Sequence, residues 1–186
     1  MALVDDLKSE VATILREQWT MRDGEAVPDT DDVKLSNDGV KLSATVLYAD
    51  LAESTSMVDT KESAFSAVIN KSLLSGACKI ITDHSGVVTA FDGDRVMGVF
   101  IGRSKNSSAA KAAMRIKYAV NEIINPAIKV QYPSSDFSVR YGAGIDSSDL
   151  LVARTGIRGS NDLVWVGPAA NYAAKLATLR KDTKTT

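Results

Sequence analysis

The chain has 186 residues, of which 45% are apolar and 24% charged, and its formal net charge is -1. This near-neutral balance argues against a large nucleic-acid footprint, which needs a basic face. The single cysteine excludes an internal disulfide framework and fits a reducing compartment. The acidic first residues do not resemble a signal peptide, and no apolar run approaches the roughly 20 residues of a membrane span. We therefore expect a cytoplasmic protein that binds neither nucleic acid nor a membrane.

The first 40 residues predict an N-terminal helix followed by a linker arm. Apolar residues recur at helical spacing through residues 3–19. The stretch MRDGEAVPDTDDVKLSNDG that follows is polar and acidic and contains Gly and Pro, which is typical of irregular chain. We therefore assign residues 1–40 to the helix and arm, and residues 41–186 to the main domain.

The main domain alternates strands and helices in an order that predicts an α+β fold. The hairpin is indicated by Asp92-Gly93 between two apolar runs, and Pro126 is expected to end the second helix. The predicted elements are a strand at 44–48, a helix at 61–83, strands at 87–91 and 96–100, a helix at 107–125, two strands around Ser147-Ser148, a strand at 163–166 and a helix from Gly167-Pro168. We expect an antiparallel sheet with helices packed on one face.

Asp50 is the first position that carries chemistry, because it ends a buried apolar strand. A small-residue turn with Ser54 and Thr55 follows it, and exposed backbone N–H groups at such a turn suit phosphate oxygens. Helix capping by Asp50 and Ser54 is the alternative interpretation.

Asp94 is the second acidic position and begins the second hairpin strand. The turn chemistry accounts for Asp92 and Gly93 but not for Asp94 or Arg95, for which edge protection is the alternative. If the two strands are neighbours, Asp50 and Asp94 lie close together, and a divalent cation relieves their repulsion.

A third pattern lies in the last helix, VWVGPAANYAAKL. Asn171 and Lys175 are four residues apart and share one helix face. A neutral donor and a cation there could hold a phosphate as charge develops in a transition state. Ordinary helix-surface polarity is the alternative, above all for Lys175.

Together these segments resemble the catalytic domain of the class III nucleotidyl cyclases, the adenylate and guanylate cyclases. The likeness runs from about Lys41 to Lys181 and rests on the joint pattern of Asp50 with its Ser-Thr turn, Gly93-Asp94 in a hairpin, RYGAGI, and Gly167 with Asn171.

The resemblance implies a ferredoxin-like domain and a two-metal reaction. Asp50, Asp94 and the carbonyl of Leu51 would hold two Mg²⁺ or Mn²⁺ ions, the ribose 3′-hydroxyl would attack the α-phosphorus, and pyrophosphate would leave. Asn171 corresponds to the transition-state Asn of the family. Lys175 stands where the family has Arg, so it keeps the charge and loses the bidentate fork.

The family builds each site between two chains, so the resemblance also implies a homodimer. The metals would come from one subunit, and Asn171 and Lys175 from the other. The chain ends soon after that helix, where members of the family continue into further strands, one bearing a phosphate-binding Lys. Either the sequence stops short of those strands or this protein lacks them.

The base-reading positions depart from the purine cyclases. Ala90 stands where adenylate cyclases carry Lys, and Val164 where they carry Asp or Thr, so neither position can hydrogen-bond a base edge. Tyr48 and Arg95 resemble instead the bacterial anti-phage pyrimidine cyclases of the Pycsar type, which make cyclic UMP or cyclic CMP for a separate effector protein. A Tyr ring can stack on a small base, and Arg can donate to a pyrimidine carbonyl. Core packing is the alternative for Tyr48.

The resulting prediction is a uridylate cyclase that makes cyclic UMP from UTP, with a cytidylate cyclase as the runner-up. A conventional adenylate or guanylate cyclase and a degenerate, non-catalytic nucleotide-sensing module stay open. Retention of both Asp50 and Asp94 argues against the module.

Overall fold

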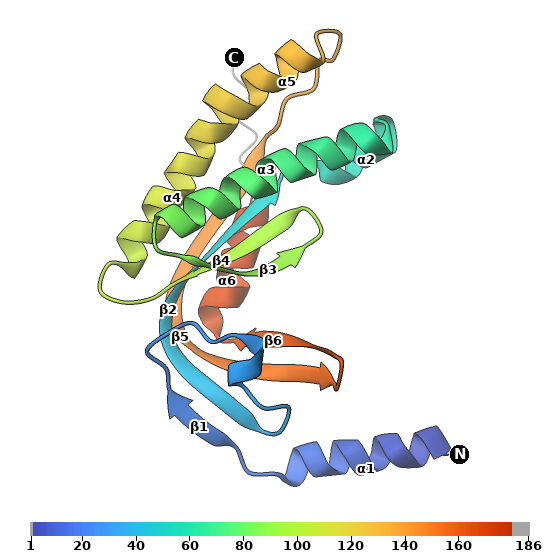
Figure 1. Cartoon of the computed structure of the whole chain (residues 1–186), viewed down its shortest axis with the longest axis vertical. Helices are drawn as coiled ribbons and strands as arrows, with labels where there is room; N and C mark the ends of the chain where they lie inside the picture. Colours follow the sequence, from blue (N-terminus) through green and yellow to red (C-terminus); the bar gives the residue numbers. More distant parts are fainter. Residues whose placement is uncertain (1, 180–186) are drawn as a thin grey trace. The chain divides into compact units, whose positions relative to one another are not determined.

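The computed structural model describes residues 2–179, which form two compact units. Within the described residues, the first unit combines 2–43 with 149–167, and the second combines 44–148 with 168–179. Two long strands, β2 (Asp38–Leu51) and β5 (Tyr141–Ile157), contribute residues to both units (Figure 1). Residues 149–167 are grouped with the N-terminal segment in the first unit.

The first unit contains the expected N-terminal helix, α1 (Ala2–Arg16). The segment expected to be an irregular arm contains β1 (Thr20–Asp23), which pairs in parallel with the start of β2, and the 3₁₀ turn η1 (Thr30–Asp32). The unit is completed by an antiparallel hairpin of β5 with β6 (Ser160–Val166).

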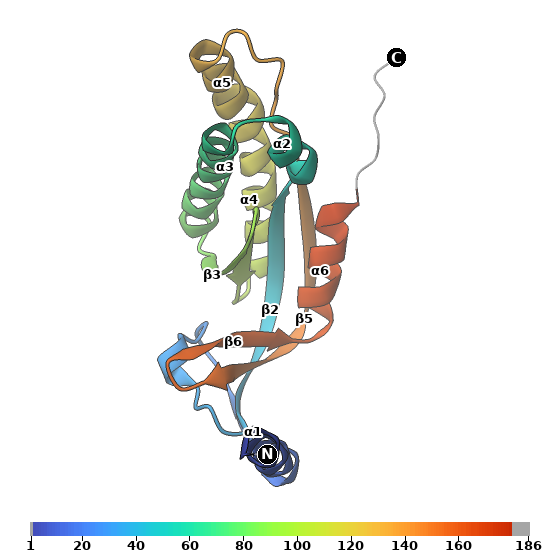
Figure 2. The ribbon, with the colours of Figure 1, turned by 90° about the vertical axis from the view of Figure 1, so that its right-hand side faces the viewer.

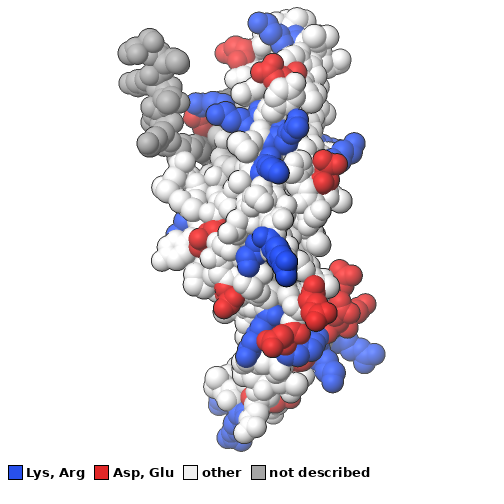
Figure 3. All heavy atoms as spheres, turned by 90° about the vertical axis from the view of Figure 1, so that its left-hand side faces the viewer, with Lys and Arg blue, Asp and Glu red and all other residues white. Residues whose placement is uncertain are grey.

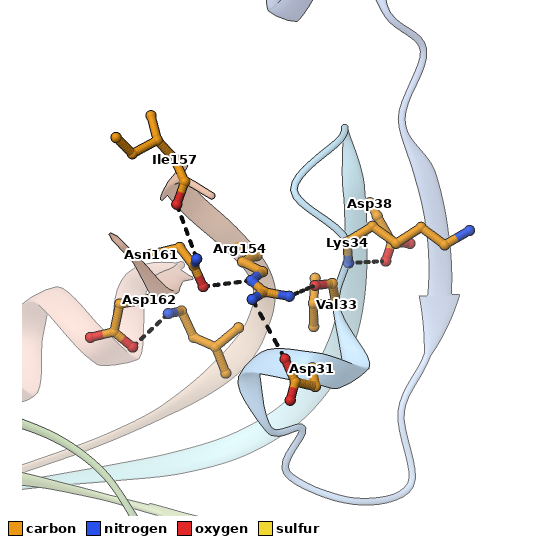
Figure 4. Close-up of polar contacts among 9 residues, drawn as sticks. Asp31, Val33, Lys34, Asp38, Arg154, Ile157, Asn161 and Asp162 are labelled. Carbon is orange, nitrogen blue, oxygen red and sulfur yellow. Dashed lines mark hydrogen bonds and ion pairs between the residues drawn. The ribbon is translucent and has the colours of Figure 1, made fainter. Parts of the chain in front are cut away.

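Arg154 on β5 holds the 3₁₀ turn to this hairpin (Figure 4). Its Nε donates to Asn161 Oδ1 at 2.7 Å, and its Nη1 donates to the Val33 carbonyl at 3.3 Å. An ion pair of 3.5 Å joins its Nη2 to Asp31 Oδ1. The polar arm is therefore ordered by one side chain from a distant part of the sequence.

The second unit carries the predicted α+β arrangement, with sheet order β3–β4–β2–β5. Its hairpin strands are where the Asp92-Gly93 signal predicts them. Its other elements are α2 (Ser54–Thr60), α3 (Ser63–Asp83), β3 (Val87–Asp92), β4 (Arg95–Phe100), α4 (Lys105–Ala119), the π-helical turn η2 (Val120–Ile124), α5 (Asn125–Gln131) and α6 (Pro168–Thr178).

Helices α3 and α4 cover one face of this sheet, as expected. Alternate β2 residues, among them Leu47 and Leu51, enter the same buried cluster as Leu73 of α3 and Ile116 of α4. That alternation leaves Tyr48 and Asp50 on the other face of β2.

Helix α6 departs from the one-face expectation, because it packs on the opposite face of the sheet (Figure 2). A Cβ atom built on Gly144 of β5 would lie 1.9 Å from the Ala173 carbonyl oxygen, and one on Gly142 would lie 1.9 Å from that of Ala177. Two glycines thus let the α6 backbone approach β5 closely.

The two strands expected around Ser147-Ser148 are one continuous strand, β5. The Ser147 hydroxyl donates to the Ala44 carbonyl at 3.2 Å, and the Ser148 hydroxyl accepts the Ala169 N–H at 3.0 Å. The serines therefore join β5 to β2 and to the start of α6 instead of forming a turn.

Pro126 does not end the second helix, which was expected to stop there. The chain passes from α4 through η2 into α5, and Pro126 takes an early position of α5. Ile124 and Asn125 keep right-handed helical backbone angles, so the helical path continues across the junction, with the π-helical turn directly before α5.

Helix α3 corrects the expectation that no stretch reaches the length of a membrane span. Among the described residues, α3 is the one helix that is long and apolar enough to cross a membrane, judged by length and composition alone. Its most apolar window has a mean hydropathy of 1.2. Its inward residues, among them Ile69, Leu73 and Ile81, lie in the core cluster. A core helix passes the same test, so this composition is weak evidence for a span.

The charges on the surface are mixed in sign. On the face drawn in Figure 3, Lys and Arg side chains are interspersed with Asp and Glu and form no continuous basic surface. This distribution matches the formal net charge of -1.

Candidate active site

The structure brings Asp50 and Asp94 to the same corner of the sheet. In the antiparallel pairing of β2 with β4, Asp50 lies opposite Arg95. The Leu51 N–H donates to the Asp94 carbonyl at 3.3 Å, one residue before β4 begins. Asp94 therefore lies in the hairpin turn and does not begin the strand as expected. Asp50 is buried, with 7% of its surface exposed, and Asp94 is half-buried. The predicted proximity of these two residues is therefore present in the fold.

A cross-strand row runs beside Asp50. Arg95 lies opposite Asp50 on β2 and opposite Asp92 on β3. The Arg95 Nη2 lies 3.2 Å from Asp92 Oδ2, and the buried Arg95 Nε has no hydrogen-bond partner within residues 2–179. Arg95 is thus oriented by one carboxylate and keeps a donor without a partner inside the chain.

A second row lies two residues along each strand, and alternation places it on the same face. Tyr48 is opposite Met97, and Met97 is opposite Ala90. Burial raises the pKa of the half-buried Tyr48, an effect that the nearby Arg95 charge opposes. Tyr48 therefore presents a neutral phenol beside Arg95.

Ala90 and Val164, the two positions that differ from the purine cyclases, lie on different strands. Ala90 adjoins Met97 in the row that ends at Tyr48. Val164 lies on β6 in the first unit, where it pairs with Ala153.

The turn after Asp50 is held by the chain that leads into β5. The Ala52 N–H donates to the Arg140 carbonyl at 2.7 Å, and the Arg140 guanidinium forms an ion pair with Glu53. Glu53 has φ of 60°, in the left-handed region, and α2 begins at the next residue. Ser54 is half-buried and Thr55 is exposed in the first turn of α2.

Asn171 and Lys175 share one face of α6, as predicted, and both are exposed. The opposite face is buried against the sheet through Ala169, Ala170, Ala173 and Ala177. At 3.6 residues per turn, Asn171 points about 160° away from Ala173. The Lys175 Nζ lies 5.7 Å from the centroid of the Tyr172 ring. Both predicted phosphate-binding residues are therefore directed away from the sheet that carries Asp50 and Asp94.

Asp50, Leu51 and Asp94 lie together at one corner of the sheet, called here the carboxylate corner. Their oxygen donors suit hard divalent cations. Within the described residues no group of three or more His, Cys, Asp or Glu side chains could hold a metal ion. Asp50 and Asp94 each supply one carboxylate where β2 and β4 meet, and the carbonyl of Leu51 is an oxygen donor at the same strand end. Carboxylate and carbonyl oxygens are the ligands that Mg²⁺ and Mn²⁺ prefer.

The sequence analysis did not identify two residues that lie at this site. Asp92 was assigned only to the turn, yet it pairs with Arg95, and Met97 separates Ala90 from Tyr48. A two-residue turn at Asp92-Gly93 would have paired Phe91 with Asp94. The turn residues are instead Gly93 and Asp94, which places Asp92 opposite Arg95. The approach of Met97 to Tyr48 needs the pairing of β4 with β2, which is not local in sequence.

Solved structures define the class of this fold. The chain is similar to the guanylyl cyclase Cya2 (TM-score 0.67, 19% identity, 75% of this chain and 71% of that one). A bacterial light-regulated adenylyl cyclase gives a TM-score of 0.65 at 19% identity, over 74% of this chain and 69% of that one. A class III adenylyl cyclase-like ATP-binding protein from Pseudomonas aeruginosa gives 0.71 at 17% identity, over 93% of this chain and 38% of that one. The fold is that of a class III nucleotidyl cyclase.

No family model matches the sequence. Curated relatives nevertheless indicate which kind of nucleotidyl cyclase the chain resembles. A uridylate cyclase from Burkholderia cepacia is 52% identical over 181 residues, which are 96% of this chain and 79% of that protein. Another from Xanthomonas perforans is 49% identical over 96% of this chain and 78% of its own length. A third, from Rhodovulum sp. (strain MB263), is 41% identical over 100% of this chain and 79% of its own length. The chain belongs to the uridylate cyclase family, and the predicted enzyme class is confirmed.

Proposed function

We propose that this chain converts UTP to 3′,5′-cyclic UMP and pyrophosphate. The observation that carries the proposal is the pair of cross-strand rows on one sheet face. The row of Asp50 and Arg95 adjoins the row of Tyr48 and Ala90, so a metal site would lie beside a site for a small base. The relatives named uridylate cyclase favour UTP over CTP.

The base would be recognised by Tyr48 and Arg95. Tyr48 offers a neutral aromatic ring, and Arg95 offers an Nε–H that has no partner in the described chain. A pyrimidine carbonyl would satisfy that donor, which is costly to leave buried and unpaired. Ala90 supplies no polar group for a purine edge, so the site would discriminate through Arg95.

The triphosphate and the reacting ribose would lie at the carboxylate corner. Asp50, Asp94 and the Leu51 carbonyl would hold two Mn²⁺ or Mg²⁺ ions, which when bound promote ionisation of the 3′-hydroxyl and neutralise phosphate charge. Ser54 and Thr55, four and five residues after Asp50 at the start of α2, would contact phosphate oxygens. The reaction forms the bond from O3′ to the α-phosphorus and breaks the bond to pyrophosphate.

The active form would be a homodimer with two equivalent sites. Asn171 and Lys175 point away from the sheet of their own chain, so they are placed to serve the site of a second copy. There they would stabilise charge on the α-phosphoryl group in the transition state. Lys175 would act as a point charge where the purine cyclases use a planar guanidinium.

We also propose that the product is a second messenger of anti-phage defence, made in the cytoplasm and read by a separate effector protein. This role is supported by the resemblance to the pyrimidine cyclases of the Pycsar type. Phage plating on cells with the wild-type chain or with Asp50→Asn, each beside its neighbouring genes, tests it. Equal plating efficiency would contradict the role.

Incubation of the purified chain with each of the four nucleoside triphosphates and Mn²⁺ tests the substrate. We expect cyclic UMP from UTP, detected by mass spectrometry, and none from the Asp50→Asn control. Cyclic CMP as the main product would reassign the base. Cyclic AMP from ATP without a pyrimidine product would contradict pyrimidine recognition by Tyr48 and Arg95.

A further inference from the structure

Helix α1 carries an apolar face that no described residue covers. None of its residues is buried. Its large apolar side chains, from Leu7 at 49% to Leu15 at 80% exposed, would be stabilised by a partner surface. The members of this face are Leu3, Val4, Leu7, Val11, Ile14 and Leu15.

The helix is nevertheless attached firmly at its C-terminal end. The Asn37 Nδ2 donates to the carbonyls of Ile14 and Glu17 at 2.8 and 2.7 Å, and the Asn37 N–H donates to Glu17 Oε2 at 3.2 Å. Asn37 is itself only 9% exposed. An isolated helix of this length is marginal in water, so an anchored helix with an open apolar face calls for a packing partner.

The spacing of the central apolar residues is that of a two-stranded coiled coil. Val4, Leu7, Val11 and Ile14 take positions a, d, a and d of two heptads. Among parallel coiled coils, Val4 and Val11 at the a positions with Leu7 at d favour two strands. A seam of this kind is self-complementary, so a second copy of the same helix fits it.

The charges beside the seam also select a parallel arrangement. In an antiparallel pair, Glu10 would face Glu10 of the other copy and Lys8 would face Lys8, which is unfavourable. In a parallel pair, Lys8 meets the apolar Leu3 and Glu10 meets Leu15, and like charges do not face one another. The outer face carries Asp5 and Asp6, and such acidic residues disfavour an anionic membrane surface.

We propose that α1 pairs in parallel and in register with α1 of a second copy of this chain. Two heptads are too short to hold a dimer in dilute solution by themselves. The inference therefore rests on the proposed homodimer, whose catalytic domains would raise the local concentration of the two helices. The pair would be a second contact between subunits, separate from Asn171 and Lys175.

Disulfide trapping in the full chain tests this pairing. The one native cysteine is removed by Cys78→Ser, and Leu7→Cys is introduced at a d position. Identical d residues of a parallel pair lie within the Cα separation of about 5.5–6 Å that a disulfide requires. We expect Leu7→Cys to cross-link at micromolar concentration about ten-fold faster than Ser9→Cys, which lies on the outer face. Since α1 buries no residue, neither change disturbs a core.

Three outcomes would overturn the proposal. Equal cross-linking of Leu7→Cys and Ser9→Cys would mean random collision. Preferential cross-linking in a mixture of Leu7→Cys with Val11→Cys would mean an antiparallel pair. Binding to phosphatidylglycerol vesicles that Leu7→Glu abolishes, without cross-linking, would assign the face to a membrane. Cyclic UMP synthesis measured on the same preparations separates failure of the pairing from failure of the proposed function.

Discussion

The carboxylate corner and the polar face of α6 differ in how much of each the single chain completes. Asp50 and Asp94 are brought together by pairing of β2 with β4 inside one chain. Asn171 and Lys175 are correctly spaced on α6, yet its alanine face packs on the sheet and directs them outward. One half of the proposed site is therefore assembled within a single chain, and in the proposed homodimer the other half would come from a second copy.

The largest expected effect is at Asp50 and Asn171, and it tests whether these two residues act from different chains. Asp50→Asn and Asn171→Ala should each lower kcat for UTP by about a hundredfold or more, because each removes a group that stabilises transition-state charge. If the halves come from different chains, co-expressing the two variants should restore about a quarter of wild-type activity, since half the dimers carry one intact site of two. Steady-state kinetics of the unfractionated dimers from the co-expression provide the measurement.

The control for this complementation is the double variant Asp50→Asn/Asn171→Ala co-expressed with the wild-type chain. Its heterodimers contain one site lacking both groups and one intact site only if the two halves lie on a single chain. The wild-type homodimers alone give about a quarter of wild-type activity. About half of wild-type activity in this control, with none from the two single variants, would show that each chain builds its own complete site.

A smaller effect is expected at Lys175. Lys175→Ala should lower kcat by about ten-fold with little change in KM, because the charge acts mainly in the transition state. Lys175→Arg keeps the charge and should retain activity, since a guanidinium also binds phosphate oxygens. A rise in KM with kcat unchanged would show that Lys175 contributes only to substrate binding. Lys129→Ala, on α5, serves as a control that removes a cation elsewhere.

Asp92 should have a modest effect confined to base recognition. Its ion pair with Arg95, at 3.2 Å, is partly exposed, so Asp92→Asn should raise KM for UTP by about three-fold and leave kcat unchanged. Comparison of KM for UTP and CTP provides the measurement. Asp136→Asn breaks the exposed ion pair with Lys61, at 3.4 Å, and should change neither constant. An equal change in both variants would exclude a positioning role for Asp92.

The smallest expected effect is on the stability of the fold, through the contact between β5 and α4. The Tyr141 hydroxyl donates to the Ala113 carbonyl, which ties β5 to α4, and burial raises the pKa of Tyr141 to about 12. Tyr141→Phe should cost about 1 kcal/mol of unfolding free energy at pH 7. Urea unfolding measures it, with the exposed Tyr118→Phe as control.

The pH dependence of this contribution has a definite sign. A tyrosine in the unfolded chain ionises near about pH 10, whereas folded Tyr141 ionises near pH 12. Its contribution is therefore fully present below about pH 10 and is lost as the pH rises towards the folded value. Tyr141→Phe should show a shallower loss of stability above pH 10 than the wild type, and an identical pH profile would contradict this assignment.

Local chemistry made much of the fold predictable. The Asp-Gly turn between apolar runs predicted the hairpin of β3 and β4, and Pro168 predicted the start of α6. The same kind of signal failed at Ser147-Ser148 and at Pro126. There the serine hydroxyls bond to other elements, and the proline lies in the first turn of α5, which follows α4 through the π-helical turn η2.

The sequence by itself determined which groups this protein has: two aspartates at strand ends, a Tyr and an Arg beside them, and an Asn and a Lys one helical turn apart. Only the tertiary structure decided that Asp50 lies opposite Arg95, that Met97 separates Tyr48 from Ala90, and that Asn171 points away from the sheet. The physical reason is that residue type and short-range periodicity act within a few residues. Strand register and the orientation of α6 depend instead on hydrogen bonds and glycine contacts between segments far apart in the chain.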